Sequence, residues 1–188
     1  NYYNFGFSKP ISVNFPAAAF GLINTKEAVS ERELASLGYG YGFTVSPFQI
    51  TAAYSVFANQ GIKKDFKLLM NDEVTSQRVI SETSAGHTLE ALEQVVKIGT
   101  GKKADIKGFS EGGKTGTVHR TISGSGYAKD LYRASFVGIA PLYNESLTIF
   151  VSIEDPGLNS YSGGMIAAPL FAKIAESSLN YLGFIEDE

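Results

Sequence analysis

Periodic apolar positions along the chain predict three helices with well-marked ends. The first begins in a capping box at residues 46–49, with Pro47 at the first helical position. Apolar residues then recur three, four and seven positions apart until residues 59–61 end the pattern. A second helix is predicted over 82–98. A third begins within 165–169 and ends before a glycine at 183.

Between the second and third helices the pattern becomes typical of strands. Residues 113–120, 133–140 and 147–154 are rich in Thr, Val, Ile and Phe. The second link contains a proline and an asparagine, which favours a hairpin, and the first, residues 121–132, is longer and contains a Ser-Gly repeat. We therefore predict three antiparallel strands in a meander, with the strand at 113–120 paired to 133–140.

The middle strand predicts how the layers pack. Both alternating sets of side chains in 133–140 are mostly apolar, so this strand needs cover on both faces. Residues 1–43 show weak periodicity and predict loops with short helical turns, one near 25–37. The predicted fold class is α/β of the α+β type, an antiparallel sheet flanked by helices.

Composition narrows the class of protein. The chain has 188 residues, 44% of them hydrophobic, which excludes a disordered protein. Its formal net charge is −3 and it has no basic tract, so nucleic acid is not an expected partner. It has no cysteine, which excludes disulfides and thiolate metal sites. No apolar run reaches the length of a membrane span.

One stretch of the sequence matches the consensus pattern of a nucleotide-binding loop. Gly108 and Gly113-Lys114-Thr115 match the Walker A pattern. A phosphate cradle needs a helix directly after the lysine. The residues that follow Lys114 include three Thr, a Val and a Gly, which favour a strand. A helix starting at Thr115 would revive the nucleotide alternative.

The same residues, taken as a strand, fit acyl transfer. Lys114 offers a fixed positive charge, and Thr115 and Thr117 place hydroxyl donors on one face. Gly116 leaves room for a ligand backbone, and the Thr117 N–H can serve as an oxyanion donor. These groups suit an anionic, peptide-like substrate. An exposed edge strand with a solvated lysine explains the four residues equally well.

The wider context carries a resemblance. Besides the Lys-Thr-Gly-Thr strand, the chain contains GYGFTVSPFQ, ANQG, GTGKKA, SFVGIAP and YSGGMIAAPLF, in this order over nearly its whole length. With these stretches the chain resembles the C-terminal part of the transpeptidase domain of class B penicillin-binding proteins, most closely their division-specific type. The resemblance implies a penicillin-binding-protein/serine β-lactamase-like fold, with residues 1–188 as the C-terminal portion of one transpeptidase domain.

The resemblance also implies a function. The whole enzyme would be a serine-type D,D-transpeptidase that cross-links peptidoglycan stem peptides ending in D-Ala-D-Ala, in septal wall synthesis. β-Lactam antibiotics would be ligands, and other division proteins would be partners. The parent would be anchored in the bacterial inner membrane with this domain in the periplasm, the fragment itself being soluble. A non-enzymatic β-lactam-sensing or scaffold module on the same fold remains an alternative.

Of the three catalytic motifs of the family, the chain shows one. The implied catalytic residues are Lys114, Thr115, Gly116 and Thr117. No serine is followed by a lysine three positions on, so the nucleophile and its base are expected upstream, and the chain alone is expected to be inactive. Ser12 and Asn14 match the second motif in letters, but the residues around them resemble the stretch downstream of that motif. Implied substrate-binding residues are Tyr132, Tyr161 and Gly163.

No cofactor and no metal are implied. His87 and His119 are the only histidines, far apart in sequence and without carboxylate neighbours. His119 shares a strand face with Thr117, and we expect it to be solvated beside the cleft.

Overall fold

The protein is built around a three-stranded antiparallel sheet. The computed structural model describes all residues except 1, 12–17, 24–28, 123–125, 158–159 and 187–188. The strands β3 (Gly112–Ile122), β4 (Gly126–Ala140) and β5 (Leu147–Glu154) lie in the order β3-β4-β5. The predicted meander is therefore confirmed. The register pairs Lys114 with Val137, so the predicted partner of the Lys114 strand is also confirmed.

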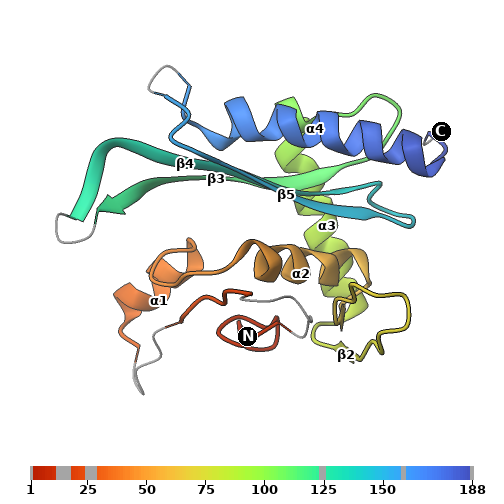
Figure 1. Ribbon diagram of the computed structural model, residues 1–188, viewed down its shortest axis with the longest axis horizontal. Coiled ribbons are helices and arrows are strands. Elements are labelled where there is room, and N and C mark those ends of the chain that lie inside the picture. Colours follow the sequence, from red (N-terminus) through yellow and green to blue (C-terminus); the bar gives the residue numbers. More distant parts are fainter. Residues whose placement is uncertain (1, 12–17, 24–28, 123–125, 158–159, 187–188) are drawn as a thin grey trace.

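The link predicted over 121–132 is wrong. β3 continues to Ile122 and β4 begins at Gly126, so most of this segment forms a long extension of the hairpin (Figure 1). The register shifts between His119 and Thr121, which marks a β-bulge within the extension. The side chains of Asp130 and Leu131, neighbouring residues of β4 within this segment, are both exposed. A strand exposed on both faces has no apolar alternation, and the periodicity of the sequence therefore did not reveal it.

The first two predicted helices begin at the predicted residues, and each has a capping residue. In α2 (Pro47–Ala58) the Ser46 hydroxyl accepts from the Gln49 N–H at 3.2 Å, and the Gln49 side chain accepts from the Ser46 N–H at 2.9 Å. α3 (Glu82–Lys97) begins after Ser81, whose hydroxyl accepts from the Ser84 N–H. Both predicted helices are thus confirmed. Each cap satisfies N–H groups that the helix itself leaves unpaired.

The remaining helices differ slightly from the prediction. α4 (Gly163–Leu182) starts two residues before the predicted window and ends, as predicted, at Gly183, whose φ is +76°. α1 (Glu31–Gly38) covers the second half of the predicted helix near 25–37, and residues 24–28 lie outside the described part of the chain.

Two layers of helix enclose the sheet (Figure 1). α4 covers one face, where Phe136 of β4 meets Phe171 with ring centroids 4.9 Å apart. α2 and α3 lie on the other face, where Ile139 packs against Leu89 and Leu92 of α3. Consecutive residues of β4 are therefore buried on opposite sides, as the apolar pattern predicts.

Three short elements complete the fold. β1 (Ile62–Lys64) pairs with β2 (Ser76–Arg78), and the 3-10 helix η1 (Lys102–Ala104) follows α3. Their shortness explains why the sequence pattern did not predict them. Within the described residues, no helix combines the length and apolar character that crossing a bilayer requires.

Candidate functional site

The four predicted catalytic residues lie along β3, an edge strand of the sheet. Residues opposite each other on paired strands share a face. Lys114 pairs with Val137 and therefore starts on the face of α2 and α3, whereas Thr115 pairs with Phe136 on the face of α4. The Lys114 side chain returns to the strand, where its Nζ donates to the Thr115 carbonyl at 3.0 Å. The Lys114 ammonium thus contacts the backbone of the strand, and the threonine hydroxyls lie on the face of α4.

Both threonine hydroxyls have a partner on the face of α4. The Thr117 Oγ1 accepts from the Gly163 N–H at 3.0 Å, and the Thr115 Oγ1 lies 2.9 Å from the Thr100 Oγ1. Gly163 is the first residue of α4, and Thr100 lies in the turn between α3 and η1. Two elements outside the sheet therefore fix the hydroxyls of the Lys-Thr-Gly-Thr strand.

Glycines allow α4 to approach the strand this closely. A Cβ on Gly163 would lie 2.3 Å from the Ser135 carbonyl oxygen and 2.6 Å from that of Gly116. A Cβ on Gly164 would lie 2.2 Å from the Thr100 carbonyl oxygen. No side chain fits at such distances, so the start of α4 rests directly on the backbone of β3 and β4. Gly163, a predicted substrate-binding residue, reaches the strand through the hydroxyl of Thr117.

Three aromatic rings lie against one another near Thr117, two of them stacked. Tyr132 and Tyr161 have ring centroids 4.2 Å apart at 21°, and the His119 ring lies 4.4 Å from that of Tyr132. His119 and Tyr132 are register partners on β3 and β4, while Tyr161 comes from the segment before α4. The two predicted tyrosines are thus brought together. His119 is exposed, as expected, yet it also belongs to the stack.

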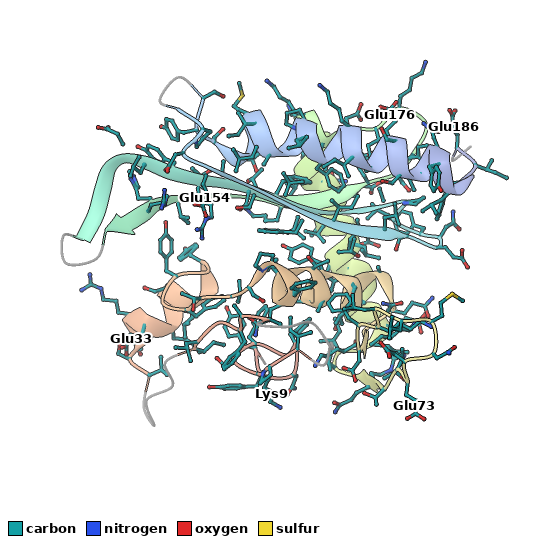
Figure 2. The ribbon with its side chains drawn as sticks, viewed as in Figure 1. Lys9, Glu33, Glu73, Glu154, Glu176 and Glu186 are labelled. Carbon is teal, nitrogen blue, oxygen red and sulfur yellow. The ribbon has the colours of Figure 1, made fainter. Side chains whose placement is uncertain are left out.

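On the other face, arginines connect the three strands near this stack. Arg133 of β4 pairs with Glu154 of β5, and Arg120 of β3 pairs with Asp155 directly after β5. Figure 2 shows Glu154 at the sheet, near the base of the hairpin extension. The Arg133 guanidinium holds the pKa of the Glu154 carboxyl below its ordinary value, first by hydrogen bonding and then by its charge. Because these groups are exposed, the pairs add little stability and act mainly on geometry.

A buried carboxyl lies just before the site strand. Glu111 is 6% exposed, and its Oε2 accepts from the Ile106 N–H at 3.1 Å. Burial raises its pKa from the ordinary 4.5 to about 7. The charges of Asp105 and Glu93 act in the same direction, while the Ile106 N–H and Lys97 oppose them.

The structure decides some of the open alternatives and adds residues that the sequence did not single out. Residues 112–122 form a strand, so the helix that a Walker A loop requires is absent from this described segment, and that alternative is wrong. Ser12 and Asn14 lie outside the described residues. Thr100 and Glu111 were not predicted as site residues. Thr100 lies in the Gly-Thr-Gly stretch quoted above, but only the tertiary contact reveals its role.

The chemistry available is that of a polar strand edge. The lysine ammonium, two oriented hydroxyls and an aromatic wall suit an anionic ligand that extends along β3. Nowhere in the described ranges do three His, Asp or Glu side chains gather to form a metal site.

Comparisons with known proteins agree with this geometry. A family model described as the penicillin binding protein transpeptidase domain matches residues 1–176. The chain is 35% identical over 184 residues to the probable peptidoglycan D,D-transpeptidase PbpC of Pseudomonas aeruginosa, covering 97% of this chain and 32% of the relative. It is 30% identical to the peptidoglycan D,D-transpeptidase FtsI of Buchnera aphidicola subsp. Baizongia pistaciae, covering 95% of this chain and 32% of that protein.

Solved structures give the same result. The apo transpeptidase domain of penicillin-binding protein 3 from Burkholderia pseudomallei superimposes with a TM-score of 0.90 at 34% identity. The match covers 100% of this chain and 57% of that chain. The chain spans about a third of the length of the curated relatives it matches and somewhat more than half of this solved domain.

Proposed function

The chain belongs to the penicillin binding protein transpeptidase family, and we propose that it forms the C-terminal portion of a peptidoglycan D,D-transpeptidase domain. The coverage supports this assignment, because the matched transpeptidase domain is longer than the chain. The sequence supports it as well, since no Ser-x-x-Lys occurs within residues 1–188. The nucleophilic serine and its base would lie in the remaining part of the domain.

The reaction would proceed in two steps through a serine ester. The serine oxygen attacks the carbonyl carbon of the D-Ala–D-Ala bond, the terminal D-Ala leaves as an amine with the proton, and an ester forms. The amine of a neighbouring stem peptide then attacks the ester, and the serine regains its proton. β-Lactams would form the same ester and remain there.

In this scheme β3 is the wall of the cleft that binds the substrate. Lys114 supplies positive charge, and the hydroxyls of Thr115 and Thr117 bind the substrate carboxylate. Backbone groups of alternate residues on an edge strand point away from the sheet. The Thr115 carbonyl accepts from the Lys114 ammonium, and in our proposal it faces the free edge. The same alternation would then turn the Thr117 N–H outward, where it would serve the oxyanion hole.

The single observation that carries the proposal is the pair of fixed hydroxyls beside the lysine. Thr117 already accepts from the Gly163 N–H, so its own O–H remains available to donate to an anion. Tyr132 and Tyr161 would form the aromatic side of the cleft, and Gly163 would contribute by holding Thr117.

The names of the relatives support a wider setting. Two of them are named peptidoglycan D,D-transpeptidases, one of them FtsI. We propose that the whole protein acts in septal wall synthesis, anchored to the bacterial inner membrane with this domain in the periplasm. Peptidoglycan stem peptides, β-lactams and other division proteins would be its partners.

Replacing Lys114 by alanine in the complete transpeptidase tests the proposal. We expect acylation by a fluorescent penicillin to slow by about 100-fold, the loss typical of one preorganised electrostatic partner. The fold should survive, because the Lys114 side chain is exposed. Lys173→Ala, at an exposed position on α4, is the matched control and should acylate at the wild-type rate. An acylation rate of Lys114→Ala within threefold of wild type would overturn the proposal.

A further inference from the structure

The turn that carries Thr100 is held rigidly between α3 and the sheet. The Gly99 N–H donates to the Gln94 carbonyl and the Gly101 N–H to the Val95 carbonyl, at 3.0 and 2.9 Å. A Cβ on Gly101 would lie 3.2 Å from the Phe136 ring and equally close to Val95, which explains the glycine. The backbone on both sides of Thr100 is therefore fixed by the last turn of α3.

Thr100 is exposed to solvent, but two of its atoms contact the two elements of the site. Its Oγ1 lies 2.9 Å from the Thr115 Oγ1, and its carbonyl oxygen lies so close to Gly164 that a Cβ there would approach to 2.2 Å. Its hydroxyl thus lies against β3 and its carbonyl against the start of α4. The fixed backbone on both sides limits how far the hydroxyl can move away from Thr115.

Counting protons on the two hydroxyls gives the direction of this hydrogen bond when an anion is bound. A threonine hydroxyl has one proton to donate and two lone pairs. If Thr115 donates its proton to a ligand carboxylate, its contact with Thr100 can be made only by accepting. Thr100 must then be the donor. The Thr117 hydroxyl is likewise an acceptor, because its partner is the Gly163 N–H, which can only donate. Its own proton is therefore free for the ligand.

We propose that Thr100 is a positioning residue that donates its proton to Thr115, so that the Thr115 O–H points to the ligand carboxylate. Successive hydroxyls in such a chain polarise one another and strengthen the final bond to the anion. The inference rests on the proposed function, because it requires Thr115 to bind a carboxylate.

The test is a set of variants in the complete transpeptidase. Thr100→Val keeps the branched shape and removes the hydroxyl, whereas Thr100→Ser keeps the hydroxyl. We expect Thr100→Val to weaken the reversible binding of a carboxylate-bearing penicillin by about 3- to 10-fold, the loss for one neutral hydrogen bond. The maximal acylation rate should change little. Thr100→Ser should restore most of the binding.

Two further measurements distinguish positioning from packing. With the methyl ester of the same penicillin, wild type and Thr100→Val should differ by less than twofold, because the ester carries no charge for Thr115 to bind. In a Thr115→Val background, Thr100→Val should have no further effect on the carboxylate ligand. Equal losses for the ester and the acid, or equal losses in Thr100→Val and Thr100→Ser, would assign Thr100 to packing and overturn the inference.

The outcomes also separate this inference from the proposed function. If Thr115→Val binds the penicillin as wild type does, Thr115 has no role toward the carboxylate, and both ideas fall. If Thr115→Val loses binding but Thr100→Val does not, the site stands and the role of Thr100 is refuted.

Discussion

The buried carboxyl of Glu111 should make the stability of the domain fall as pH rises. Its pKa is raised from 4.5 to about 7 in the folded protein, so between these pH values the folded state keeps a proton that the unfolded state releases. Stability decreases with rising pH wherever the folded state binds more protons. The contribution of Glu111 to the unfolding free energy is therefore largest below pH 4.5. It falls as pH rises from 4.5 to about 7.

The size of the effect follows from the shift. One pKa unit corresponds to about 1.4 kcal/mol, so the unfolding free energy should drop by roughly 3 kcal/mol across this range. Glu111→Gln removes the charge, and its amide oxygen can still accept from the Ile106 N–H. The variant should match wild type near pH 4.5 and exceed its stability by up to this amount above pH 8.

The assay is denaturant unfolding of the complete transpeptidase at several pH values between 4.5 and 8.5. Subtracting wild type from Glu111→Gln cancels the titration of all groups that do not interact with Glu111. Glu176→Gln, on the exposed side of α4 (Figure 2), is the control, and its difference from wild type should show no such slope. A Glu111→Gln difference that does not grow with pH would refute the burial argument.

Three further predictions follow from packing and from the missing motif. Phe136→Ala, at a position with no exposed surface, should lower the unfolding free energy by about 3–5 kcal/mol, measured by denaturant unfolding. Gly163→Ala should slow acylation at least several-fold because its Cβ would force α4 off the strand, whereas Gly86→Ala, which has open space in α3, should acylate normally and melt no lower. Residues 1–188 alone should give no covalent penicillin adduct by intact mass, and a stoichiometric adduct would show that the nucleophile lies within them.

Local sequence signals were enough to predict the helices that have capping residues and the strand that has a clear apolar pattern. The capping box at Ser46 and Gln49 marks the start of α2, and Gly183 marks the end of α4. The two-sided apolar pattern of residues 133–140 correctly required helices on both faces. These features depend on neighbours a few residues away, and a single sequence therefore reveals them.

Features set by distant contacts were not predictable in the same way. Glycine is a poor helix former, so propensity places the start of α4 after Gly163 and Gly164. Both are nevertheless helical, and the close approach of the sheet and of Thr100 leaves no room for a side chain at either position. The link between Thr100 and Thr115 joins residues 15 positions apart, through a turn without periodicity. The raised pKa of Glu111 depends on its burial in the folded protein and on the charges of Asp105 and Glu93, which composition does not encode.

The late position of α4 in the chain has a consequence for biosynthesis. A ribosome makes β3 and β4 before it makes α4, which supplies Phe171 to cover Phe136 and the Gly163 N–H to hold Thr117. Until then the nascent sheet carries the complete Lys-Thr-Gly-Thr strand with one bare face. An mRNA truncated before α4 would therefore yield a polypeptide that contains the whole Lys-Thr-Gly-Thr motif but no assembled cleft. Its exposed apolar face would direct it to chaperones or proteases.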